Sequence, residues 1–206
     1  MNRQEEDDAV DERITAALER LARAQQVALR RAAGRHGLSA IQAQTLLHLR
    51  PGGGPPGRAR VSHLAREFDV TKATVSDAVA SLVAKGLLRR ETARDGRVAT
   101  LVLTPQGLRL ASQLADWAAP FTAALGSLPE GSQEPLLSSL MSLIEALQQL
   151  GVITVARMCT TCRFFERDRY DDPLAPHRCA LLRKRLATAS LRVDCPEHEP
   201  ATSASR

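Results

Sequence analysis

Apolar residues recur at helical spacing through the beginning of the chain. Val10, Ile14, Leu18 and Leu21 follow one another at steps of three and four, and Glu and Arg are among the residues between them. One apolar stripe on a polar background is typical of an amphipathic helix. The pattern predicts a first helix from about residue 8 to residue 33, where glycines follow.

A second helix is predicted from Ser39 to Leu49. Ser39 can accept a hydrogen bond from the first helical turn, and Pro51 cannot continue a helix. The stretch 51–57 contains only Pro and Gly and predicts a surface loop.

Three further elements follow the loop in a recognisable order. Residues 61–68 and 71–86 predict two short helices with a turn at 69–70, which is the helix-turn-helix layout. Residues 89–104 then change to a strand pattern around a turn that contains Asp95 and Gly96, which favours a two-stranded hairpin. Helix, helix and hairpin in this order predict a winged helix.

Helical periodicity returns after Pro105. An apolar stripe extends from Leu110 to Leu128, and Pro120 should kink or break this helix. After a loop at 129–133, a last long helix is predicted from Glu134 to about Val155. The predicted fold class is mainly α: a winged helix-turn-helix with long N- and C-terminal dimerisation helices and a small cysteine-rich tail.

Composition agrees with a helical protein. Of the 206 residues 44% are hydrophobic but only 3% are aromatic, so Leu, Ala and Val must fill most of the core. The expected division is a winged-helix domain at 1–155, a four-cysteine module at 156–200 and a disordered tail at 201–206. The chain shows no signal peptide, lipidation motif or membrane-spanning run, so we expect a cytoplasmic protein.

Five short motifs in the central region resemble the MarR family of bacterial transcription regulators. They are Thr71-Lys-Ala-Thr-Val-Ser-Asp77, Leu82-Val-Ala-Lys-Gly-Leu-Leu88, Arg89-Arg90, Asp95-Gly-Arg97 and Leu103-Thr-Pro-Gln-Gly107. The resemblance extends over about residues 8–155. It implies a homodimer joined by the first and last helices, an arginine of the wing in the DNA minor groove at Arg97, and repression rather than activation.

The residues themselves favour the same partner, double-stranded DNA. The predicted helix from Lys72 to Lys85 would be about 21 Å long, enough to lie in a major groove, and Val75, Val79, Leu82 and Val83 should be buried. Residues 58–97 contain nine basic and five acidic residues, a net charge of +4 out of +5 for the whole chain. The candidate DNA-binding residues are Thr71, Lys72, Thr74, Ser76, Asp77, Ser81, Arg94 and Arg97. Asp77 would repel DNA phosphates unless it pairs with a basic side chain such as Arg66 or Lys72. The two wing arginines, Arg94 and Arg97, could instead simply face solvent.

All four cysteines lie in the last quarter of the chain, at Cys159, Cys162, Cys179 and Cys195. A C-x2-C pair aims two sulfurs at one point, and in a reducing compartment clustered cysteines favour a metal site over disulfides. The spacing and Phe164 resemble the cluster-binding segment of high-potential iron–sulfur proteins, which implies a [4Fe–4S] cluster held by these four residues. Structural zinc is the alternative.

The other polar and aromatic residues of the tail leave choices open. Phe164, Phe165 and Tyr170 could cover a bound group or form a small core against the last helix. His177 and His198 lie near the cysteines, but four thiolates already complete a ligand set, so neither is counted as a ligand.

The sequence therefore predicts a DNA-binding transcription regulator whose DNA affinity responds to redox state, oxygen, nitric oxide or iron through a [4Fe–4S] cluster. Two alternatives remain: a regulator that senses a small organic ligand and carries structural zinc, and an iron–sulfur protein for electron transfer or docking. An enzyme is not expected, because no catalytic triad, carboxylate pair or phosphate-binding loop is visible.

Overall fold

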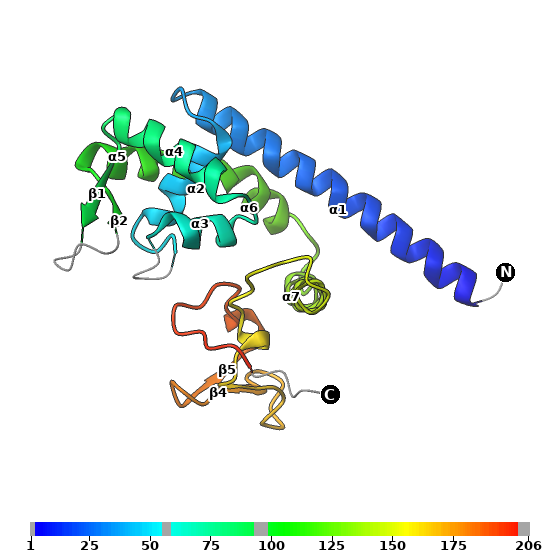
Figure 1. The fold of residues 1–206 in the computed structure, drawn as a ribbon. Coiled ribbons are helices and arrows are strands. Elements are labelled where there is room, and N and C mark those ends of the chain that lie inside the picture. The colour runs from blue at the N-terminus through cyan, green and yellow to red at the C-terminus, as the bar shows by residue number, and fades with distance from the viewer. Residues whose placement is uncertain (1–2, 55–58, 93–98, 202–206) are drawn as a thin grey trace.

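The computed structural model describes residues 3–54, 59–92 and 99–201 and confirms a mainly helical winged-helix fold (Figure 1). The elements before the cysteines are α1 (Arg3–Gly34), α2 (Ala40–Leu49), α3 (Val61–Glu67), α4 (Lys72–Ala84), β1 (Leu88–Thr92), β2 (Ala99–Leu103), α5 (Pro105–Leu114), η1 (Ala115–Ala118), α6 (Ala119–Gly126) and α7 (Gln133–Gln149). No helix in the described ranges is long and apolar enough to cross a membrane.

Hydroxyl side chains begin three of these helices. Ser39 forms a capping box with Gln42 at the start of α2, and Thr71 accepts from the backbone N–H of Thr74 at the start of α4. Thr104 accepts from the N–H of Gly107, directly before Pro105 at the start of α5. Each cap satisfies a backbone donor that the helix itself leaves without a partner, so the local sequence fixes where these helices begin.

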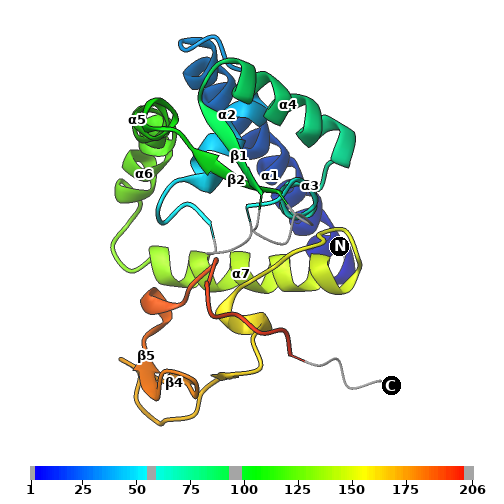
Figure 2. The same cartoon turned by 60° about the vertical axis from the view of Figure 1, so that its left-hand side comes forward.

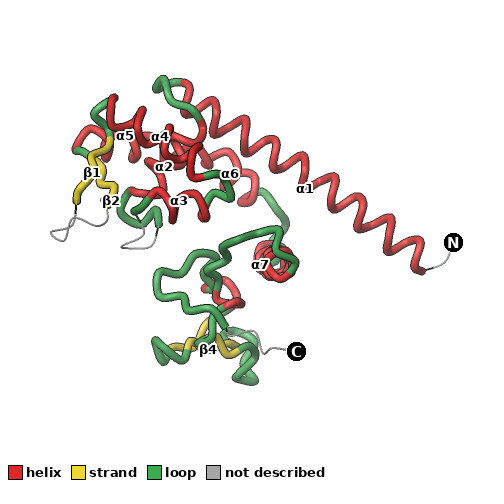
Figure 3. The backbone as a smooth tube through the Cα atoms, in the orientation of Figure 1, coloured by secondary structure: helices red, strands yellow, loops and turns green. Residues whose placement is uncertain are grey.

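The winged-helix core is apolar and contiguous. Leu46, Leu64, Val75, Val79 and Leu82 from α2, α3 and α4 are fully buried. Burial of each such side chain contributes about 1.5–3 kcal/mol. Strands β1 and β2 pair antiparallel, with Leu88 opposite Leu103, and place the wing beside this core (Figure 3).

Three expectations about the helices are settled by the structure. Pro120 does interrupt the stripe, because the chain passes through η1 and restarts as α6 with this proline in its first turn. The last helix ends at Gln149 rather than near Val155, since Gly151 adopts a left-handed conformation (φ 74°) that ends a helix. Val83 was expected to be buried but is 38% exposed, because it lies beyond the apolar stripe of α4.

Residues after α7 form a small module of short elements. They are η2 (Cys159–Thr161), β3 (Phe165–Glu166), β4 (His177–Cys179), β5 (Lys184–Leu186) and η3 (Thr188–Ser190), and the antiparallel sheet has the order β3-β4-β5. Met158, Leu186 and Leu191 pack with Met141 of α7 in a second apolar cluster. In Figure 2, α7 runs between the winged helix and this module.

Candidate nucleic-acid interface and four-cysteine pocket

The N-terminal end of α4 presents the polar residues predicted to meet DNA. Thr71, Lys72, Thr74 and Asp77 are all exposed. Thr71 also caps the helix, and its hydroxyl lies 2.9 Å from that of Thr74. Among the described residues, no ion pair joins Asp77 to Arg66 or to Lys72, so neither of its two predicted basic partners is paired with it.

The other predicted contacts are placed differently. Ser76 and Ser81 are half-buried, and the hydroxyl of Ser81 accepts a 2.9 Å hydrogen bond from the side-chain amide of Gln42. Ser81 therefore fastens α4 to α2 and does not join the exposed group at the helix start. Arg94 and Arg97 lie outside the described residues.

The module brings the four cysteines to one small enclosed pocket. Cys159, Cys162, Cys179 and Cys195 are all half-buried free thiols, and they line it together with apolar side chains. These apolar residues are Phe164, Phe165, Leu181, Leu182 and Leu186, and the carboxylate of Glu197 lies at the same pocket. Among the described residues, no group of three or more His, Cys, Asp or Glu side chains is already arranged as a metal site.

Backbone pairing positions each thiol. The N–H of Cys162 donates to the carbonyl of Cys159 in the η2 turn at 3.0 Å, which sets the C-x2-C pair. Cys179 ends β4 opposite Phe165 of β3. The N–H of Cys195 donates to the carbonyl of Arg157 at 2.8 Å, so the last thiol returns to the start of the module.

Arg192 supplies donors to two of the sulfurs. Its N–H lies 3.2 Å from Sγ of Cys159, and its guanidinium lies 3.7 Å from Sγ of Cys195. Burial raises the pKa of Cys159 and of Cys195, and these donors oppose the rise. Arg192 is not among the residues predicted from the sequence, although its place three positions before Cys195 could have suggested it, because a nearby cation favours a thiolate.

Tyr170, His177 and His198 are not among the described residues that line the thiol pocket. Tyr170 stacks under the guanidinium of Arg185 at 4.4 Å and does not line the pocket. His177 is buried and accepts from the N–H of Asp168, and the ring of His198 contacts the hydroxyl of Thr161. Phe165 serves both roles considered for the aromatics, because it lines the pocket and packs on the cluster beneath α7.

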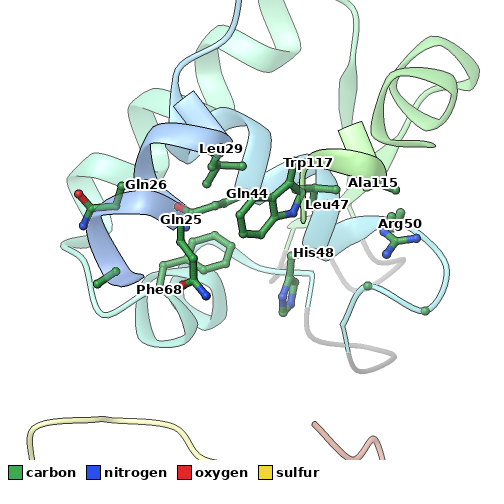
Figure 4. Close-up of a pocket in the computed structure, with 13 residues that line it drawn as sticks. Gln25, Gln26, Leu29, Gln44, Leu47, His48, Arg50, Phe68, Ala115 and Trp117 are labelled. Atoms are coloured by element: carbon green, nitrogen blue, oxygen red, sulfur yellow. The ribbon is translucent and has the colours of Figure 1, made fainter. Parts of the chain in front are cut away.

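A separate cavity of about 460 Å³ lies between α1, α2 and the residues around Trp117 (Figure 4). Leu29, Leu47, Phe68 and Trp117 give it apolar walls, and Gln25, Gln44 and His48 add polar groups. The ring of His48 packs edge-on against Phe68 at 5.6 Å. Burial lowers the pKa of His48, which favours the neutral imidazole. The cavity thus combines apolar surface with a few hydrogen-bonding groups.

Residues 36–98 match the family model described as "MarR family". A search of curated proteins gave no match. Among solved structures, the MarR family transcription regulator SP03579 is 19% identical with a TM-score of 0.62, and the alignment covers 73% of this chain and 98% of that one.

Two further neighbours carry a ligand. A complex of S. aureus MepR with DNA is 16% identical with a TM-score of 0.56, over 65% of this chain and 95% of that one. CouR from Rhodococcus jostii RHA1, bound to p-coumaroyl-CoA, is 19% identical with a TM-score of 0.52, over 63% and 90%. These neighbours show that the chain shares their winged-helix fold, and its central segment, residues 36–98, is similar to the MarR family.

Proposed function

We propose that the chain is a homodimeric regulator that binds double-stranded DNA through α4 and the wing, and that its DNA affinity responds to an iron–sulfur cluster held by the four cysteines. The observation that carries the proposal is the attachment, through α7 and the segment 150–158, of a four-thiol pocket to a winged helix. The DNA-binding part and the cysteine part rest on separate observations and are tested separately.

DNA binding is supported by the start of α4. The helix has 13 residues, a length of about 20 Å, and its exposed end carries Thr71, Lys72 and Thr74. Hydroxyl and ammonium groups at a helix N-terminus can reach both phosphates and base edges. The MepR neighbour, which has a similar fold, was solved with DNA. Arg94 and Arg97 of the wing stay predicted DNA contacts.

Dimer formation is supported by apolar side chains left exposed on the two long helices. Val10, Ile14 and Leu21 of α1 are each about half exposed, and Leu136 and Leu140 of α7 are each 37% exposed. An apolar stripe on a helix is normally covered by another element. A second copy that pairs through α1 and α7 would cover both stripes and space two α4 helices for successive major grooves.

Substitution of Lys72 by Ala tests the DNA-binding part. The probe is a duplex that the protein itself enriches from a random-sequence pool, and affinity is measured by fluorescence anisotropy at several salt concentrations. Loss of one phosphate contact should weaken binding and reduce the salt slope by about one. Arg109→Ala removes an equal charge from the exposed face of α5 and should leave the slope unchanged. Equal slopes for both variants would contradict the proposed interface.

The cluster is supported by the chemistry of the pocket. Four thiols face one cavity with apolar walls, and Arg192 offers N–H donors to two sulfurs, as sulfur ligands of clusters require. Thiolates around a single zinc ion would lie about 3.8 Å apart, since the Zn–S bond is about 2.3 Å. Either a cluster or one zinc ion would use the same four thiols, so the metal content decides between them. Such a cluster would supply redox chemistry and reactivity toward oxygen and nitric oxide.

The response then follows from the module's own residues. Without a shared metal, the four thiolates would be like charges in one apolar pocket. The thiolates must then take up protons or move apart. Either change loosens residues 156–200, which pack on α7 through Met158 and Leu186. Since α7 is also the proposed dimer helix, the geometry of the two DNA-reading helices changes with the module.

An absorption spectrum with iron and zinc analysis, on protein purified without oxygen, tests the cluster. A broad band near 400 nm and about four irons per chain are expected. DNA affinity should then change on exposure to air or nitric oxide. A colourless protein with about one zinc per chain would contradict the cluster and make the module a structural zinc site.

A second candidate function is favoured by the cavity beside α1. Its size and mixed lining suit a small organic ligand, and the CouR neighbour was solved with p-coumaroyl-CoA. In this second candidate function, the cysteine module holds structural zinc, and an organic ligand bound in the cavity changes the DNA affinity. Leu47→Trp would fill the cavity and should abolish any ligand response while DNA binding persists. A response to air or nitric oxide that survives this substitution would favour the cluster instead.

A further inference from the structure

Arg157 is a buried charge in the segment that leads from α7 into the module. Its side chain is only 4% exposed. Its two terminal nitrogens bind the carboxylate of Glu67, at 2.5 and 2.9 Å, and its Nε donates to Asp194 at 2.9 Å. One guanidinium thus joins two carboxylates from distant parts of the chain.

These two carboxylates belong to the two functional regions. Glu67 is the last residue of α3 and directly precedes the turn that leads to Thr71 and α4. Asp194 directly precedes Cys195, whose N–H donates to the carbonyl of Arg157 itself. Arg157 therefore contacts the helix-turn-helix on one side and the backbone of a thiol ligand on the other.

The same segment also borders a pocket at the N-terminal end of α4. Thr154 lines a pocket together with Arg66, Thr71 and Lys72, and with other residues of the turn. The linker between α7 and the module thus faces the helix-turn-helix at two places: Thr154 shares a pocket with Thr71 and Lys72, and Arg157 pairs with Glu67 at the end of α3.

The burial of Arg157 makes the contact responsive to both partners. Two carboxylates share this one buried guanidinium, so loss of either one removes part of its hydrogen bonding and leaves the other as its only charged partner. Burial alone would lower the pKa of Arg157, but hydrogen bonds to Glu67 and the charges of Glu67 and Asp194 raise it, so the group stays cationic. If Cys195 moves, Asp194 moves with it, and the guanidinium of Arg157 loses the contact that helps to orient it toward Glu67.

We propose that Arg157 is the positioning residue that couples the four-cysteine module to the helix-turn-helix, through Asp194 on one side and Glu67 on the other. The inference rests on the proposed function for its biological meaning, but the coupling itself is a property of the folded chain. Under this proposal, a change in the cysteine module reaches the helix-turn-helix through the Asp194–Arg157–Glu67 contact within one chain, in addition to any change at the dimer helices.

The test uses Asp194→Asn in the full-length protein stripped of metal, with hydrogen exchange of α3 and the turn (61–71) as the readout. Loss of the carboxylate charge should speed exchange there by about tenfold, within the range of coupled pairs. The control is Glu199→Gln, which breaks the exposed Arg163–Glu199 pair of the same module without reaching α3. Unchanged exchange in Asp194→Asn, or equal change in the control, overturns the coupling.

The second arm compares DNA affinity with and without the bound metal. Wild type and Glu199→Gln should differ between the two states by about 5- to 150-fold, whereas Glu67→Gln should lose most of that difference at unchanged metal content. Retention of the full difference in Glu67→Gln overturns the coupling.

The two arms separate the two ideas. If Asp194→Asn alters exchange but metal never alters the DNA affinity of wild type, the coupling stands and the proposed function fails. If Glu67→Gln does not fold by circular dichroism, Asp194→Asn carries both arms, because the side chain of Asp194 is 48% exposed and tolerates substitution.

Discussion

The winged helix and the cysteine module are held together by different forces. The winged helix buries one contiguous cluster to which α1, α2, α3, α4 and α5 all contribute. The module shares a small cluster with α7 and otherwise relies on ion pairs, among them Glu166–Arg178, Asp172–Arg185 and Arg192–Glu197. Exposed ion pairs contribute little, about 0–1 kcal/mol each. The comparison teaches that the winged helix is held by apolar burial, whereas the module has little apolar burial of its own and, in the proposed function, gains order from a group bound by its thiols.

The largest effect should come from a cavity in the winged-helix core. Leu82 is fully buried, and Leu82→Ala should lower the free energy of unfolding by about 2–5 kcal/mol. Denaturant unfolding of the full chain measures this value. The adjacent Val83→Ala is the control, since Val83 is 38% exposed and should change stability by less than about 0.5 kcal/mol. Similar losses for both would show that the core is not packed as described.

Loss of one thiol should unfold the module and spare the winged helix. Cys179→Ser removes one thiol from the pocket, so under the proposed function the metal should be lost and amide exchange across 156–200 should rise by about tenfold or more. Protection of α2 and α4 should be retained. Metal-stripped wild type is the reference and should resemble the variant. If Cys179→Ser keeps its metal and its protection, the module does not depend on the four thiols.

The same contrast explains what the sequence could predict. In the winged helix each local signal agrees with the packing: Ser39 and Thr71 cap, Pro120 breaks a helix, and Val75, Val79 and Leu82 share one buried stripe. Periodicity and capping act over a few residues, so a sequence reveals them. The errors arose where one residue outweighed the pattern, as Gly151 did at the end of α7.

The candidate sites were predictable only in part. Clustering of the four cysteines followed from their spacing, and the structure brings their side chains to one pocket. The role of Ser81 was not predictable, because its partner Gln42 is 39 positions away. The Glu67–Arg157 pair spans 90 positions and carries no periodic signal. Tertiary contacts of this kind depend on how whole elements pack, which short-range patterns do not encode.

The junction between the two regions gives a smaller effect. Gly151 has φ 74° and no neighbour within 4 Å of an added Cβ, so Gly151→Ala should cost about 1 kcal/mol through backbone strain alone. Gly126 also has open space but lacks a positive φ, and Gly126→Ala should be neutral or slightly stabilising. Thermal unfolding of both variants measures the difference. Equal effects would show that the end of α7 does not need a left-handed residue.

The smallest effect concerns His48, which senses charges from both regions. Burial lowers its pKa below 6.5, Glu67 and Asp194 oppose this, and Arg157 adds to it. Because the unfolded chain then binds the proton more readily, His48 should cost stability as the pH falls below about 6.5. His48→Gln should therefore flatten the stability curve between about pH 7.5 and 5.5.

Asp194→Asn provides the sharper version of that test. It removes a module charge that raises the pKa of His48, so an NMR titration should show the imidazole pKa shifted further down. Glu199→Gln, in the same module but absent from the groups that act on His48, should leave it unchanged. An unchanged His48 pKa in Asp194→Asn would show that the charge of Asp194 does not reach His48. A shift would instead establish that His48, in the wall of the winged-helix cavity, responds to Asp194, which directly precedes Cys195.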